Sequence, residues 1–170
     1  FNGTDGVTGE ELRRSDGTAT GTGLVADVRT GAQSSSPGNL TVSNGWLFFA
    51  ASDGLSTDYD LWKTDGTTPG TSKVKDFSSM YLWNLVDVSG TLYFSPSANG
   101  SWTEEIWKSD GTSGGTVEVR DVWVGGDAMP EDLTVFGGRL FFQASDGTQL
   151  GEPWISDGTF AGTTIIADIN

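Results

Sequence analysis

A short Asp-Gly-Thr pattern recurs four times along the chain and limits the folds open to it more than any other feature. It stands in "ELRRSDGTATGT" (11–22), "DLWKTDGTTPGT" (60–71), "EIWKSDGTSGGT" (105–116) and "EPWISDGTFAGT" (152–163). The four aspartates are Asp16, Asp65, Asp110 and Asp157, and they lie 49, 45 and 47 residues apart. A catalytic constellation is normally unique in a chain, whereas a structural unit is reused, so this spacing predicts a repeat architecture.

Between the repeated turns, apolar residues alternate with polar ones, which is typical of strands and not of helices. The clearest hairpin is "LTVSNGWLFFAA" (40–51), in which two β-rich runs surround Asn44-Gly45. This pair accepts the positive φ angles of a type I′ turn. We expect four strands per repeat, called a to d: strand a at 40–42, 85–88 and 133–135; b at 46–50, 91–95 and 139–144; c around 61–62, 106–107 and 153–154; d at 72–77, 117–122 and 164–169.

Four antiparallel strands in a period of about 45 residues, with longer Gly-, Ser- or Pro-rich links between units, are typical of a β-propeller blade. We therefore predict an all-β fold, a β-propeller or a segment of one. A β-sandwich accepts such strands but does not explain why one unit recurs. Complete blades are expected at 39–77, 84–122 and 132–169, and an incomplete blade without its first strand at 1–28. Upstream sequence or another copy of the chain would supply that strand.

Composition excludes several classes of function. The formal charge of −14 repels phosphate backbones and anionic membrane surfaces, so neither nucleic acid nor membrane insertion is expected. The chain has no Cys and no His. Disulfides, thiolate metal sites, His-ligated zinc and His-dependent nucleophilic catalysis are therefore excluded within this chain. No apolar run approaches the length of a membrane span.

The repeated stretches resemble the bacterial ELWxxDGT repeat, a module of large secreted or surface-associated proteins. The residues that carry the resemblance are "DLWKTDGT", "EIWKSDGT", "EPWISDGT" and a degenerate "ELRRSDGT", each followed after two residues by Gly-Thr, together with "FFAASDG" and "FFQASDG". The resemblance covers essentially the whole chain and implies a propeller-like extracellular module, secreted or on the cell surface. It carries over no catalytic residues. The first copy departs from the pattern because Arg13 stands in the tryptophan position.

The residues shared by the repeats have a structural interpretation. Asp16, Asp65, Asp110 and Asp157 are expected to accept backbone amides in Asx-type turns, with the following glycines at positive φ. The aligned Trp62, Trp107 and Trp154 face the same side of their blades. They either fill the gap between blades or form a set of sugar-stacking platforms, and core packing is the stronger interpretation.

Calcium is the cofactor to consider. Asp-Gly turns follow strand b, and acids open strand c six or seven residues later, so that carboxylates and turn carbonyls could supply the six to eight oxygens of a calcium site. The candidate ligands are Asp5, Asp53, Asp146, Glu11, Asp60, Glu105 and Glu152. The chain lacks both the EF-hand loop and the nonapeptide of a calcium β-roll, so solvated turn residues are the stronger interpretation of the same acids.

Residues that break the repeat are better candidates for a specific function. The loop aromatics Tyr81, Trp83, Trp102 and Trp123 could bind glycans or protein partners, or could instead cover the ends of the blades. Asp58, Tyr59 and Glu104 lie in comparable loops and could add polar contacts.

We expect a non-catalytic extracellular module for binding, adhesion or surface and filament assembly. Its partner would be a cell-surface protein or glycan, a further copy of the chain, or the remainder of a longer chain. The alternatives are a lectin-like carbohydrate binder that uses loop tryptophans and a carboxylate-based glycan-active enzyme. No non-repeated pair of acids lies close in the sequence in an apolar setting, which argues against the enzyme.

Overall fold

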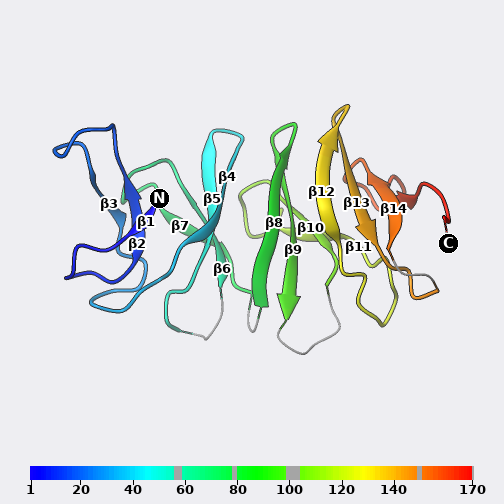
Figure 1. The fold of residues 1–170 in the computed structure, drawn as a ribbon, viewed down its shortest axis with the longest axis horizontal. Coiled ribbons are helices and arrows are strands. Elements are labelled where there is room, and N and C mark those ends of the chain that lie inside the picture. The colour runs from blue at the N-terminus through cyan, green and yellow to red at the C-terminus, as the bar shows by residue number, and fades with distance from the viewer. Residues whose placement is uncertain (56–58, 78–79, 99–103, 149–150, 170) are drawn as a thin grey trace. The chain divides into compact units, whose positions relative to one another are not determined.

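The computed structural model describes residues 1–55, 59–77, 80–98, 104–148 and 151–169 (Figure 1). These residues form antiparallel β-sheets of three or four strands and no helices, which confirms the all-β prediction. A helix long and apolar enough to cross a membrane is accordingly absent from the described ranges. The chain divides into two compact units, Phe1–Tyr81 and Leu82–Asn170.

Each sheet is a meander in which strands that follow one another in sequence pair side by side. Sheet A consists of β1 (Asn2–Gly3), β2 (Glu11–Arg14) and β3 (Gly23–Ala26). Sheet B consists of β4 (Gly38–Ser43), β5 (Trp46–Ala51), β6 (Asp60–Thr64) and β7 (Ser72–Lys75). Sheet C consists of β8 (Met80–Val88), β9 (Thr91–Ala98), β10 (Ile106–Ser109) and β11 (Val117–Arg120). Sheet D consists of β12 (Glu131–Phe136), β13 (Arg139–Ala144), β14 (Glu152–Ser156) and β15 (Thr164–Ile165).

The hairpin between β4 and β5 turns at the predicted dipeptide. Asn44 and Gly45 have φ angles of 47° and 78°, and Ser43 pairs with Trp46 across the turn. Positive φ at both central residues gives the turn the twist of its flanking strands, which confirms the type I′ prediction. In sheet D the turn at Gly137 and Gly138 repeats this geometry, with φ angles of 60° and 74°.

The last strand of each complete repeat is shorter than predicted. Strand d was expected at 72–77, 117–122 and 164–169, but β7 ends at Lys75, β11 at Arg120 and β15 at Ile165. The register between β6 and β7 shifts at Leu61/Trp62, which leaves Val74 as a buried bulge residue. Past the ends of β7 and β11, the amides of Phe77 and Val122 donate to the carboxylates of Asp60 and Glu105. In sheet D the amide of Ile166 still donates to Pro153 O, and the amide of Ile169 donates to Glu152.

Within the first unit, sheet A packs on sheet B. The buried cluster consists of Leu12 and Val25 from sheet A with Phe49 and Ala51 from sheet B, and Val28, Leu47 and Trp62 pack against it. We call the side of a sheet that carries the positions of Leu12, Val25 and Val28 its leading face. The side that carries the positions of Leu47, Phe49, Ala51 and Trp62 is its trailing face. Sheet A therefore buries its leading face on the trailing face of sheet B.

The same contact recurs in the second unit between sheets C and D. The leading face of sheet C supplies Ile106, Val119 and Val122, and the trailing face of sheet D supplies Leu140, Phe142, Ala144 and Trp154. Each fully buried aliphatic or aromatic side chain of this kind contributes about 1.5–3 kcal/mol. A polar contact accompanies both pairs: Arg14 Nη1 donates to Gly66 O at 3.0 Å, and the aligned Lys108 Nζ donates to Gly158 O at 2.6 Å. One sheet-on-sheet interface is thus used twice.

Candidate functional site

The repeated Asp-Gly-Thr segment is a self-contained hydrogen-bonded turn. Asp65 Oδ1 accepts the backbone amide of Thr67 at 2.9 Å and its hydroxyl at 2.7 Å. Gly66 has a φ of 91°, which disfavours any residue with a Cβ. A Cβ on Gly70 would lie 2.0 Å from the Asp65 carboxylate, so the second glycine of the segment is required as well. Asp16, Asp110 and Asp157 make the same two bonds to Thr18, Thr112 and Thr159.

The remaining hydroxyls of the segment close the same turn. Thr64 Oγ1 lies 2.7 Å from Thr71 Oγ1, and Thr71 Oγ1 also donates to Thr67 O at 2.7 Å. The hydroxyl pair recurs seven residues apart in the other repeats, as Ser15 with Thr22, Ser109 with Thr116 and Ser156 with Thr163. Hydrogen bonds from the threonine side chain and backbone lower the pKa of Asp16, Asp65 and Asp157. The side chains that repeat most strongly therefore stabilise a turn.

The acid that opens strand c is a buried acceptor for the chain 17 residues later. Glu105 Oε2 accepts the amide of Val122 at 2.8 Å, and its Oε1 accepts that of Trp123 at 3.4 Å. The same spacing of 17 residues joins Glu11 to Val28, Asp60 to Phe77 and Glu152 to Ile169. We call these four carboxylates the latch acids. Each satisfies a backbone amide at the point where strand d ends.

The latch acids differ in their charge surroundings. Asp60 also accepts the ammonium group of Lys73 at 2.6 Å, and Lys73 contacts Asp53 at 2.7 Å. Burial by itself lowers the pKa of Lys73, but its bonds to these two carboxylates outweigh burial and raise it. Burial raises the pKa of Glu105 to about 7, partly offset by the two amides that it accepts. Glu105 is therefore a carboxyl that titrates near neutral pH.

The seven carboxylates predicted as calcium ligands have protein partners. Four are the latch acids, and the other three accept amides of their own turns: Asp5 from Val7, Asp53 from Leu55 and Asp146 from Thr148. The backbone bond from Val7, followed by the bond from Arg13, lowers the pKa of Asp5. Within the part of the chain that the structure describes, no group of three acids is placed so that it could hold a metal ion. Calcium binding stays a prediction and gains no support from this arrangement.

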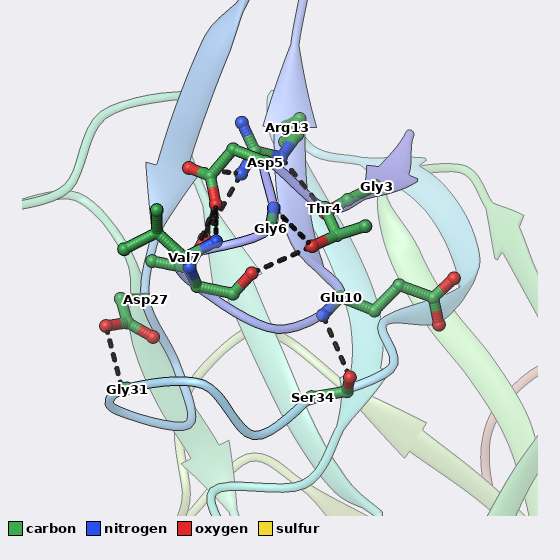
Figure 2. A network of polar contacts seen from close by, with 11 residues as sticks. Gly3, Thr4, Asp5, Gly6, Val7, Glu10, Arg13, Asp27, Gly31 and Ser34 are labelled. Carbon is green, nitrogen blue, oxygen red and sulfur yellow. Dashed lines mark hydrogen bonds and ion pairs between the residues drawn. The ribbon is translucent and has the colours of Figure 1, made fainter.

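The tryptophan position has two different occupants. Trp154 is 4% exposed, stacks on Phe142 with ring centroids 6.4 Å apart, and donates its indole N–H to Ala144 O at 3.2 Å. In sheet A, Arg13 Nε donates to Gly3 O at 3.0 Å, and its guanidinium lies 2.9 Å from Asp5 (Figure 2). Gly3 and Ala144 hold aligned positions. The Arg13 guanidinium in sheet A therefore donates to the same backbone carbonyl position that accepts the Trp154 indole N–H in sheet D. Trp62 and Trp107 are partly buried.

The predicted loop aromatics fall into different environments. Tyr81 is partly exposed, and its ring centroid lies 5.4 Å from that of Tyr59. Trp123 packs against the core cluster of sheets C and D, where a Cβ on Gly126 or Gly147 would lie 2.2 or 2.3 Å from its ring. Trp102 and Asp58 lie outside the described residues. Of the predicted ligand-binding residues of the second unit that the structure describes, Trp83 is the more exposed, at 50%.

Trp83 borders an open polar pocket of about 380 Å³ in the second unit. Its lining is Trp83, Asn84, Ser95, Ser97, Glu104, Pro130, Glu131 and Asp132. Asn84 Nδ2 donates to Ser95 Oγ at 3.2 Å and to Pro130 O at 3.3 Å, which ties β8 to β9 and to the segment before β12. Ser97 donates to Glu104, and burial followed by the negative charges of Asp127 and Glu131 raises the Glu104 pKa. The pocket thus combines an aromatic face with carboxylates.

Sequence reasoning pointed to Trp83 and Glu104 separately and missed their neighbours. Glu131 and Asp132 belong to β12, far along the chain from Trp83. The packing of sheet C on sheet D brings them to the pocket that Trp83 borders. Two sequence features could have pointed to this pocket: Trp83 and Glu131 hold aligned positions in successive repeats, and Glu104 departs from the repeat.

Comparison of the chain with protein-family models, with curated proteins and with solved structures gives no match.

Proposed function

We propose that the chain is a non-catalytic extracellular β-propeller repeat module whose function is binding, adhesion or surface assembly. The observation that carries this proposal is the use of the repeated polar residues. The turn aspartates, the threonines and the latch acids bond the backbone or one another in every repeat. Side chains committed to the scaffold in this way are not free to perform chemistry, and the repeated sheet-on-sheet contact supports a blade-like stack. The secreted or cell-surface setting rests on the resemblance to ELWxxDGT repeats.

A lectin-like activity is the second proposal, and the pocket beside Trp83 favours it. A half-exposed indole offers an apolar ring face on which a sugar ring can stack. The carboxylates of Glu104 and Glu131 beside it are acceptors for hydroxyl donors. These residues are not required by the repeated turns. A glycan is the ligand class that matches both an apolar ring face and several hydroxyl acceptors.

The same carboxylates support a third proposal, a glycan-active enzyme. Glu104 has a raised pKa, as a general acid requires, and Glu131 lines the same pocket. Binding and catalysis at this pocket are separated by whether a bound polysaccharide is cleaved.

A glycan array, followed by titration of any hit and a reducing-end assay on the corresponding polysaccharide, tests these proposals. Trp83→Ala should weaken binding by about tenfold or more, because it removes the aromatic platform. Phe1→Ala is the matched control, since this exposed aromatic lies in the first unit and outside the pocket lining, and it should leave binding unchanged. Equal loss in both variants would exclude the Trp83 pocket as the binding site. Release of reducing ends that Glu104→Gln abolishes would overturn the non-catalytic proposal.

A further inference from the structure

The leading face of sheet D is apolar and exposed, although the aligned residues elsewhere are buried. Ile166 and Ile169 are 52% and 68% exposed. Their counterparts in sheet C, Val119 and Val122, are buried against sheet D. Phe136 and Phe141 add an edge-to-face aromatic pair with centroids 6.1 Å apart. These residues take the places of Val88 and Tyr93, which belong to the core cluster of sheets C and D. Sheet D therefore repeats the pattern that sheet C buries.

A hollow in this face has the size of a docking groove. It measures about 270 Å³, and Phe141, Pro153, Ile166 and Ile169 are among its lining residues. Pro153 is aligned with Ile106, which is fully buried in sheet C. Contiguous exposed apolar surface of this kind marks an interaction site more often than a free surface.

The surface that would complement this face is also present on the chain. In both units, the leading face of one sheet packs against the trailing face of the next sheet. The trailing face of sheet A carries Phe1, Gly3 and Arg13 at the positions of Phe142, Ala144 and Trp154. Phe1 is 53% exposed, whereas Phe142 is buried. Arg13 keeps the carbonyl bond that Trp154 makes in sheet D, so this face retains that feature of a trailing face.

We propose that the leading face of sheet D docks on the trailing face of sheet A in a second copy of this chain. The occupant follows from continuity with the two interfaces already formed, since each pairs a leading face with a trailing face of the same repeat. The contact is head to tail, so it joins different surfaces of the two copies and produces closed rings or filaments. The inference rests on the proposed repeat module and adds a second copy of the chain as its partner.

The observed interfaces fix the register of the docked one. Thr68 Oγ1 of sheet B donates to Val25 O of sheet A at 2.7 Å. In the second unit Phe160, aligned with Thr68, lies against Arg120 with the guanidinium carbon 4.8 Å from the ring centroid, next to Val119. The corresponding pair across the proposed contact is Ala19 on one copy and Ile166 on the other.

Cysteine cross-linking tests this register directly because the chain has no Cys. Ala19→Cys protein carrying a size tag is mixed with untagged Ile166→Cys protein under mild oxidation, so a disulfide between the two variants joins two copies. We expect a covalent heterodimer that greatly exceeds the product of Ala19→Cys with Val124→Cys, an exposed position outside this face. Equal yields from the two mixtures would overturn the proposal.

Sedimentation of the protein without cysteines supplies the second measurement. The average mass should rise with concentration, and Ile166→Asp should raise the apparent dissociation constant by about tenfold or more while the far-UV spectrum stays unchanged. Because each copy carries a formal charge of −14, added salt should strengthen the association.

A mass that stays monomeric at all concentrations would overturn the second copy as the occupant. So would a double variant, Ala19→Cys with Ile166→Cys, that forms its disulfide only within one chain, because the same faces would then close on each other in the monomer. Neither outcome affects glycan binding at Trp83, so failure of this inference is distinguishable from failure of the proposed function.

Discussion

The tryptophan position in sheet D and the same position in sheet A show how far one repeat can diverge while its backbone stays the same. Trp154 is buried, stacks on Phe142 and donates to Ala144 O. Arg13 donates to the aligned carbonyl of Gly3 and pairs with Asp5. In these two sheets the aligned backbone carbonyl accepts an N–H, from an indole in sheet D and from a guanidinium in sheet A. In sheet D the residue at this position also adds apolar area to the buried cluster that sheets C and D share.

The largest effect is expected from Trp154→Ala. Removing a buried aromatic side chain leaves a cavity between sheets C and D and costs about 3–5 kcal/mol of unfolding free energy. Trp154→Arg should cost at least as much, because the new guanidinium would meet Arg120, whose guanidinium carbon lies 5.7 Å from the Trp154 ring centroid. Urea unfolding followed by far-UV circular dichroism measures both variants.

Trp107→Ala is the matched comparison for this prediction. The sequence alone gives the aligned tryptophans the same packing role, but Trp107 is only partly buried, so its loss should cost less than that of Trp154. Equal costs at both positions would mean that burial does not decide the energetics of the tryptophan position.

A smaller effect is expected from the pH dependence of the second unit. The folded-state pKa of Glu105 is about 7, above the ordinary value of 4.5, so between these limits the folded state holds more protons than the unfolded state. The contribution of Glu105 to stability is therefore fully present below about pH 4.5 and is lost as the pH rises to about 7. The chain has no His to mask this decline.

Glu105→Gln isolates the contribution of this carboxyl. The amide keeps an oxygen that can accept the Val122 N–H but does not titrate, so the stability of the variant should fall less between pH 5 and pH 8. Urea midpoints measured across this range provide the comparison. Parallel curves for the two proteins would contradict a raised pKa at Glu105.

The sequence predicted the backbone turns well and the hydrogen-bond partners of the buried acids poorly. Asn44-Gly45 determines its own turn, because the preference for positive φ is local. The spacing of the repeated Asp-Gly-Thr segment predicted the order of the strands. By contrast, the sequence left calcium open as the partner of the latch acids Glu11, Asp60, Glu105 and Glu152. No local sequence signature shows whether a buried carboxylate binds a cation or accepts a backbone amide 17 residues away.

The pocket beside Trp83 escaped prediction for a related reason. Asn84, Glu104 and Glu131 are separated in sequence, and their assembly depends on how β8, β9 and β12 lie together in the second unit. The early end of strand d also depends on a long-range bond, from the amide of Phe77 to Asp60. Local propensity cannot report such contacts.

The smallest effect is expected from Arg13→Trp, the reverse of the change in sheet D. The variant loses the contact of the guanidinium with Asp5, a partly exposed pair of the kind that contributes about 0–1 kcal/mol. A tryptophan at this position can stack on Phe1, as Trp62 stacks on Phe49 with centroids 6.5 Å apart, and can donate to Gly3 O. The gain and the loss are similar in size, so the unfolding free energy should change by less than about 1 kcal/mol. A loss as large as that of Trp154→Arg would show that sheet A has its own requirement for arginine, and that the two positions are not equivalent.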